Sequence, residues 1–223
     1  MSYLIAPSIL AADFARLGEE VETVIEAGAD VIHFDVMDSH YVPNLTIGPP
    51  VLEALINRLP SLSVDVHLMV QHESDTLVRN FISAGCSYIS IHPESTTVPF
   101  EILETIRKAD VKAGIVLNPD EPISNVNPFI DYIDYLLIMS VFPGRGGQKF
   151  IPETVPRLRE ARNLLDSKST QIRLEVDGGI SAQNIGLVAE AGADMFVAGT
   201  AIFGTPDYSQ TIQHLRSQLG SAI

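Results

Sequence analysis

Short apolar runs alternate with helical patterns along the whole of this 223-residue chain. The runs predict eight strands, at residues 4–10, 31–37, 64–70, 88–92, 112–117, 135–141, 172–176 and 195–198. Helical spacing of apolar residues predicts helices near 14–27, 50–59, 74–84, 99–109, 123–130, 152–165, 182–191 and 208–219. Strict alternation implies a parallel sheet with helices outside it, and eight units close into a (β/α)8 TIM barrel. We therefore expect an α/β fold of that architecture.

A weak internal repeat supports the barrel. Residues 27–30, 84–87 and 191–194 each place a glycine between a helix and the next strand, where a left-handed C′ position is common. The main competing fold, an open doubly wound sheet, is disfavoured because no glycine-rich fingerprint follows the first strand. No linker or low-complexity run interrupts the pattern, so we expect one catalytic domain over residues 1–223.

Charge and composition limit the classes of partner that this chain could bind. The formal net charge is −14, which argues against a nucleic-acid or anionic-membrane partner. An anionic small molecule stays open, because backbone amides bind phosphate whatever the overall charge. The lone cysteine, Cys86, fits a reducing compartment, and no leader or membrane-spanning run is evident. We expect a cytoplasmic protein that acts on a small molecule.

Two strands carry histidine and aspartate in alternation. Successive side chains of a strand point to opposite faces, so His33 and Asp35 share a face on one strand and Asp65 and His67 on the next. A later strand ends in Asp177. Chemistry in such barrels sits at the carboxyl ends of the strands. We therefore expect His33, Asp35, His67 and Asp177 to form a four-ligand site for a divalent ion such as Zn²⁺, Fe²⁺, Mn²⁺ or Co²⁺.

Further inward positions suggest how such a site would be used. A bound ion would polarise a carbonyl and an adjacent hydroxyl, and the two carboxylates would act as general acid and base. Asp65 and Glu175 lie deeper on the same face and predict a buried polar layer. A single histidine at a strand end is more often a hydrogen-bonded core residue. Two such histidines together with two strand-end aspartates at the same mouth of the barrel favour a functional site.

Glycine-rich loops follow the last three strands. Barrel enzymes often bind phosphate with the loops after strands seven and eight. The candidate residues are Gly144, Arg145, Gly146, Gly147, Gly178, Gly179, Gly199 and Thr200. Ordinary turns are the alternative interpretation.

Three methionines fall at or near strand ends. Met37, Met69 and Met139 are expected to face the same mouth as the candidate ligands. They would form either a soft cap that excludes water or ordinary core filling.

At the level of motifs, the chain resembles the ribulose-phosphate 3-epimerase family. The resemblance covers nearly the whole chain. It is carried by APSILAADF at 6–14, HFDVMD at 33–38, VPN at 42–44, GP at 48–49, DVHLM at 65–69, AGIVLNP at 113–119, MSV at 139–141, GGQKFIP at 146–152, EVDGGI at 175–180 and AGTAIF at 198–203.

The resemblance implies an activity and roles. It implies interconversion of D-ribulose 5-phosphate and D-xylulose 5-phosphate by inversion at C3, through an enediolate on a divalent metal. Matching positions make Asp35 the acceptor of the C3 proton and Asp177 the donor on the opposite face. Ser8 and His67 would contact the sugar, and the glycine loops the phosphate. Members commonly self-associate, so a homo-oligomer is expected.

Four positions depart from the family pattern: Ser39, Phe142, Arg145 and Thr200. Because Phe142 and Arg145 alter the loop after strand six, a ketohexose 6-phosphate such as D-allulose 6-phosphate is an alternative substrate. A related 3-keto-acid phosphate decarboxylase is a second reaction class, but those enzymes typically place a lysine on the strands where this chain has His67 and Asp177, and this chain lacks one there. A phosphate-binding barrel without activity is the third hypothesis, and the retained ligand set argues against it.

Overall fold

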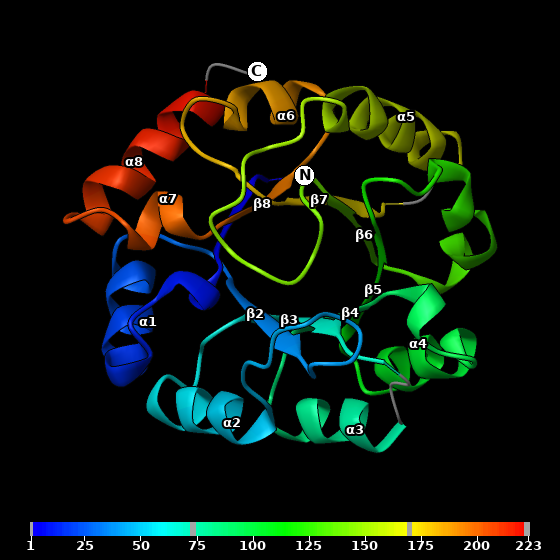
Figure 1. Ribbon diagram of the computed structural model, residues 1–223, viewed down its shortest axis with the longest axis horizontal. Helices are drawn as coiled ribbons and strands as arrows, with labels where there is room; N and C mark the ends of the chain where they lie inside the picture. Colours follow the sequence, from blue (N-terminus) through cyan, green and yellow to red (C-terminus); the bar gives the residue numbers. More distant parts are fainter. Residues whose placement is uncertain (1, 72–74, 169–170, 221–223) are drawn as a thin grey trace.

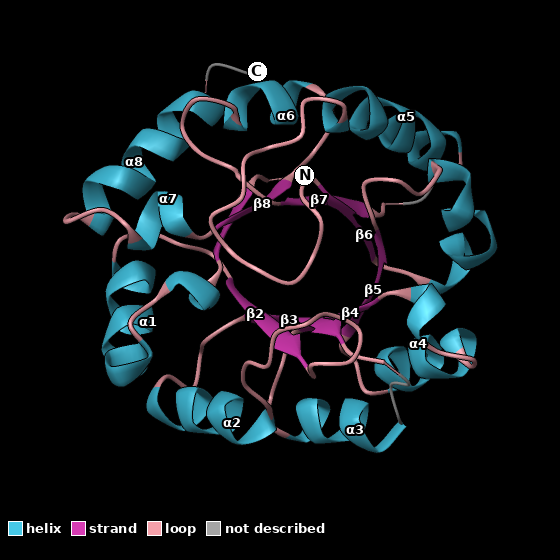
Figure 2. Ribbon diagram, in the orientation of Figure 1, coloured by secondary structure: helices cyan, strands magenta, loops and turns pink. Residues whose placement is uncertain are grey.

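The computed structural model describes residues 2–71, 75–168 and 171–220 as a ring of parallel strands inside a ring of helices (Figures 1 and 2). The expected (β/α)8 barrel is confirmed. The strands are β1 (Leu4–Pro7), β2 (Ile32–Met37), β3 (Val64–Met69), β4 (Tyr88–Ile91), β5 (Lys112–Leu117), β6 (Tyr135–Met139), β7 (Arg173–Asp177) and β8 (Met195–Ala198).

Helices cover the outer face of the barrel. They are α1 (Leu17–Glu26), α2 (Pro49–Arg58), α3 (Asp75–Ser83), α4 (Pro99–Lys108), α5 (Thr154–Ser167), α6 (Ile185–Glu190), α7 (Thr200–Phe203) and α8 (Tyr208–Leu219). 3-10 helices supplement them: η1 (Ile9–Ala11), η2 (Phe14–Arg16), η3 (Pro93–Ser95) and the longer η4 (Ile123–Tyr132).

Strand register places the polar side chains level with one another. Asp35 of β2 pairs with His67 of β3, and His33 pairs with Asp65. Across the barrel, the ladders run from β2 through β8 to β1. A single parallel bridge between Ser8 and His33 joins β1 to β2 and completes the circle.

Two apolar regions hold this arrangement. Between strands and helices, side chains such as Phe34, Phe81 and Phe196 are fully buried in one large core. Inside the barrel there are smaller apolar clusters, one around Met195 of β8 and another around Leu137 of β6. The polar groups of the upper interior are therefore surrounded by well-packed walls.

Several expected bounds were wrong in ways that have local causes. β1 ends at Pro7, not residue 10, because the chain turns into η1. Asp13 caps the 3-10 turn η2, where its side chain accepts a hydrogen bond from Ala15 N at 3.0 Å, and α1 begins only at Leu17. The helix expected near 123–130 is the 3-10 helix η4, which contains Pro128.

Other differences are smaller. α7, after β8, was not predicted because four residues are too few for a periodic signal. The expected start of the third helix, Ser74, lies outside the described residues. Among the helices of the described ranges, none has the length and apolar character needed to cross a membrane.

Candidate active site

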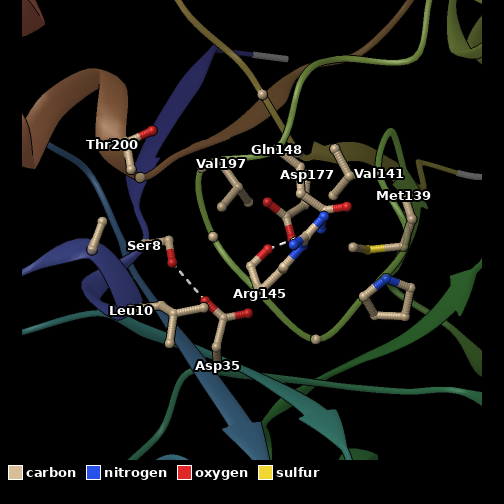
Figure 3. Close-up of a pocket in the computed structure, with 18 of the residues that line it drawn as sticks. Ser8, Leu10, Asp35, Met139, Val141, Arg145, Gln148, Asp177, Val197 and Thr200 are labelled. Atoms are coloured by element: carbon tan, nitrogen blue, oxygen red, sulfur yellow. Dashed lines mark hydrogen bonds between the residues drawn. The ribbon is translucent and has the colours of Figure 1, made fainter. Parts of the chain in front are cut away.

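A cavity opens at the carboxyl ends of the strands, the end of a (β/α)8 barrel at which small molecules bind. Figure 3 shows Ser8, Asp35, Met139, Arg145 and Asp177 around it. The loop after β6 passes over the opening in Figure 1. The candidate residues found in its lining are Ser8, Asp35, Met37, Met69, Met139, Gly144, Arg145, Gly146, Gly147, Asp177, Gly178, Gly179, Gly199 and Thr200.

Both candidate histidines lie fully buried directly below this cavity. His33 Nδ1 lies 2.6 Å from Asp65 Oδ2. Because a carboxylate oxygen only accepts, Nδ1 carries a proton and donates a hydrogen bond to Asp65. Burial alone lowers the pKa of His33, but Asp35 and Asp65 outweigh it and raise that pKa well above its ordinary value. The other ring nitrogen, Nε2, has no hydrogen-bond partner in the described part of the chain.

Asp35 extends from β2 toward both histidines. The Ser8 hydroxyl donates a hydrogen bond of 2.5 Å to Asp35 Oδ2. The other oxygen, Oδ1, lies 3.5 Å from His33 Nε2 and 3.6 Å from His67 Nδ1. Burial works to raise the pKa of Asp35, but His33 and then His67 hold it far below its usual value. Asp35 is therefore a carboxylate at neutral pH.

The four side chains fit a divalent metal ion. One ligand atom from each of His33, Asp35, His67 and Asp177 lies within 4.8 Å of every other. Four ligands at about 2.1 Å in tetrahedral geometry stand about 3.4 Å apart, close to the Asp35–histidine separations above. His33 Nε2 and His67 Nδ1 are buried without hydrogen-bond partners among the described residues, which is costly unless another group satisfies them.

Asp177 ends β7 on the opposite side of the cavity from Asp35, and Figure 3 shows both carboxylates turned inward. Its backbone oxygen accepts hydrogen bonds of 2.7 Å from both Ser140 N and Ser140 Oγ, which fix the strand end. Burial, opposed by His33 and reinforced by Asp35, raises the pKa of Asp177 to about 6. The two acids thus differ sharply in proton affinity.

The expected polar layer lies below the four candidate ligands. Tyr135 donates a hydrogen bond of 2.8 Å to Asp65 Oδ1, so Asp65 is held by Tyr135 and His33 together. Burial and the nearby Asp65 raise the pKa of Glu175 well above normal, which favours its neutral acid form. Gly114 admits the Tyr135 ring, because a Cβ there would stand 2.4 Å from a ring carbon.

Glycines bring backbone close to the cavity where no other residue fits. Gly178 has φ +122°, and a Cβ on it would lie 2.6 Å from Val141 Cγ2. Gly179 has φ +64°, and its Cβ would lie 2.5 Å from Phe150 N. Such contacts exclude side chains, so these two loop positions require glycine.

The loop after β6 is tied together by Gln148, which sequence reasoning did not select. Its side-chain amide donates to Phe142 O at 2.7 Å and to Arg145 O at 2.9 Å. Arg145 itself is exposed at the rim. The family motif GGQ contained the signal for Gln148, but not its role as a loop brace.

A second set of residues missed by sequence reasoning surrounds His67. His67 Nε2 lies 2.9 Å from His92 Nε2, and His92 Nδ1 lies 2.8 Å from the Tyr41 hydroxyl. Tyr41 in turn donates to Glu94 Oε1 at 2.5 Å. His92 is the last residue of the strand expected at 88–92, but Tyr41 and Glu94 lie in connections without periodicity.

Solved structures share this fold. A 3-keto-L-gulonate-6-phosphate decarboxylase from Vibrio cholerae superposes with a TM-score of 0.77 at 14% identity, covering 100% of both chains. A 3-hexulose-6-phosphate synthase from Salmonella typhimurium gives a TM-score of 0.72 at 16% identity, again covering 100% of both. At such low identity, these likenesses establish the barrel alone.

Sequence relatives establish the family. The model of the Ribulose-phosphate 3 epimerase family matches residues 4–203. The chain is 54% identical over 217 residues to ribulose-phosphate 3-epimerase of Escherichia coli, covering 97% of this chain and 96% of that protein. It is 56% identical over 206 residues to the Serratia marcescens enzyme of that name, covering 92% and 98%. The ketohexose phosphate alternative is not favoured. The chain belongs to the ribulose-phosphate 3-epimerase family, whose members are isomerases.

Proposed function

We propose that this chain interconverts D-ribulose 5-phosphate and D-xylulose 5-phosphate by inverting C3, with Asp35 and Asp177 as opposed base and acid. One observation carries the proposal. Two carboxylates with very different proton affinities reach a common cavity from opposite walls, directly above two buried histidine nitrogens that lack partners. Inversion needs two such groups, because a single base returns the proton to the face it left.

Four residues would hold the catalytic cation: His33 through Nε2, His67 through Nδ1, and Asp35 and Asp177 each through one oxygen. A cation at this site would polarise the substrate's carbonyl and adjacent hydroxyl and lower the cost of forming an enediolate. Imidazole and carboxylate suit Zn²⁺, Fe²⁺, Mn²⁺ and Co²⁺, and availability often decides among them.

The two aspartates divide the proton transfer. Asp35 is ionised at neutral pH and accepts the C3 proton of ribulose 5-phosphate. Asp177, whose pKa is raised to about 6, donates a proton to the other face of C3. In the reverse direction Asp177 accepts and Asp35 donates. The Ser8 hydroxyl, 2.5 Å from Asp35 Oδ2, orients that carboxylate and lies within reach of the sugar.

The phosphate would lie against the glycine loops. Backbone amides near Gly146–Gly147, Gly178–Gly179 and Gly199–Thr200 border the same cavity, and their glycines leave room for close approach. Arg145 stands at the rim and would add a charge-assisted contact to the phosphate.

Three methionines close the apolar side of the cavity. Met37 and Met69 belong to one buried cluster and Met139 to another, and all three line the cavity. Their side chains would exclude water from the carbanionic intermediate, so that an aspartate and not a water molecule protonates it.

Purified protein tests the proposal. Metal should be removed by chelation, each of the four cations restored in turn, and conversion of ribulose 5-phosphate followed together with exchange of the C3 proton into D₂O. We expect conversion and exchange only in metal-restored protein. A chain that binds none of these cations and exchanges no C3 proton would instead support a phosphate-binding barrel without activity.

A further inference from the structure

A chain of hydrogen-bonded side chains leads from the rim of the barrel to His67. It begins at Glu94 in η3 and passes through Tyr41 in the loop after β2. It continues through His92, just after β4, to His67 on β3. His67 and His92 are fully buried, whereas Glu94 reaches the surface. None of the first three residues lines the substrate cavity.

The direction of each hydrogen bond follows from the outer end of this chain. Burial opposes ionisation of Glu94, but His92 and Tyr41 lower its pKa, so Glu94 is a carboxylate that only accepts. Burial and Glu94 raise the pKa of Tyr41, so its hydroxyl keeps its proton. At 2.5 Å from Glu94 Oε1, that proton is donated to the carboxylate.

The Tyr41 oxygen must then accept its remaining hydrogen bonds. Asn118 Nδ2 donates to it at 2.9 Å and also to Glu94 Oε1 at 2.8 Å. The 2.8 Å contact with His92 Nδ1 is consequently donated by the histidine. Tyr41 thus makes one donated and two accepted hydrogen bonds, the full capacity of a phenol.

His92 passes this constraint to His67. A neutral imidazole carries one ring proton, and in His92 the contact with the Tyr41 oxygen places that proton on Nδ1. Its Nε2 is therefore an acceptor, and the 2.9 Å contact with His67 Nε2 is donated by His67. A neutral His67 protonated at Nε2 has its lone pair on Nδ1. That atom faces Asp35 Oδ1 at 3.6 Å and lacks a hydrogen-bond partner in the described ranges.

We propose that Glu94, Tyr41 and His92 are positioning residues that fix the tautomer and ring orientation of His67, so that Nδ1 is presented to the cation. The inference rests on the proposed metal site. Asp65 performs the corresponding task for His33 directly, as a carboxylate on Nδ1. For His67 the corresponding carboxylate is that of Glu94, which acts through the Tyr41 phenol and the neutral His92 imidazole.

Zinc affinity of the full-length protein tests this inference, measured by competition with a chelating dye. His92→Leu removes the acceptor for His67 Nε2, and we expect the zinc dissociation constant to rise about 10–100-fold, the usual cost of losing an outer-shell partner. His92→Gln places an amide oxygen where the imidazole Nε2 accepts, so its affinity should return close to that of wild type. Equal weakening by both substitutions would overturn the tautomer argument.

A matched pair of double variants separates the relay from general stability. Tyr41→Phe with Glu94→Gln removes the outer anchor and should weaken zinc binding. Tyr208→Phe with Glu20→Gln removes a similar phenol–carboxylate hydrogen bond of 2.7 Å between α8 and α1, and should leave zinc binding unchanged. Equal zinc affinity in the two double variants would contradict the relay.

A direct reading of the tautomer does not depend on any variant. Long-range ¹⁵N–¹H correlation spectra of wild-type histidines, before and after zinc addition, should show His67 protonated at Nε2 in both states. Protonation at Nδ1 before zinc addition would overturn the inference. If wild-type protein binds no zinc at all, the proposed metal site fails, which is a different result from a relay that has no effect on binding.

Discussion

Asp177→Asn isolates one half of the proposed proton transfer. The substitution keeps the shape of the side chain, and both hydrogen bonds from Ser140 go to the backbone oxygen of residue 177, so the strand end should remain in place. What is lost is the ability to carry a proton. Loss of a general acid or base costs about 10²–10⁴-fold in rate, or about 2.7–5.5 kcal/mol in activation free energy. We expect kcat for epimerisation to fall by that factor.

The same variant should retain half of the chemistry. Asp35 still accepts the C3 proton of ribulose 5-phosphate and can return a solvent proton to the same face. Proton NMR in D₂O should therefore show deuterium entering C3 of ribulose 5-phosphate without inversion. Xylulose 5-phosphate should not exchange, because its C3 proton faces residue 177.

Two controls make this prediction specific. Zinc content is measured first, since an asparagine amide is a weaker ligand than a carboxylate. Glu175→Gln, on the same strand and one inward position lower, replaces a group whose raised pKa favours its neutral form, and should leave turnover near wild type. Near-wild-type turnover of Asp177→Asn, or equal exchange of both epimers by it, would refute the opposed-acid mechanism.

Three further outcomes are expected. As pH increases through the acidic range, zinc affinity should rise at least about tenfold per pH unit, because His33 has a raised pKa and must release a proton to bind metal. Calorimetric titration with zinc at several pH values checks this, and an affinity that does not change with pH would contradict it. Arg145→Phe should raise KM for ribulose 5-phosphate and leave kcat largely unchanged, whereas an unchanged KM would remove Arg145 from the phosphate site. Gly178→Ala should lower the melting temperature, because its Cβ would stand 2.6 Å from Val141 Cγ2 at φ +122°; equal melting temperatures would show that the loop adjusts freely.

The sequence was most informative where periodicity and topology act together. Alternation along two strands placed His33 and Asp35 on one face and His67 beside them, and strand pairing in the structure puts Asp35 level with His67. The rule that strand ends converge then brought in Asp177 from a distant segment. These four residues could be grouped before any coordinates, although their roles remain proposals.

Contacts made by loops could not be predicted in this way. Tyr41 reaches His92 only because the loop after β2 folds back over the barrel, and no local pattern specifies that path. Gln148 braces the loop after β6 through two backbone oxygens, which a sequence does not locate. The helix α7 was missed because its four residues are too few for a periodic signal, whereas the helix expected near 123–130 was found, but as the 3-10 helix η4.

Anomalous diffraction from crystals of the zinc-loaded protein, with a planar enediolate analogue bound, tests the central claim most directly. The account predicts one zinc peak at about 2.0–2.2 Å from His33 Nε2, His67 Nδ1 and one oxygen each of Asp35 and Asp177, with the two acids on opposite faces of the analogue. Zinc held instead by the deeper group of His33, Asp65 and Glu175, or both acids on one face of the analogue, would contradict it.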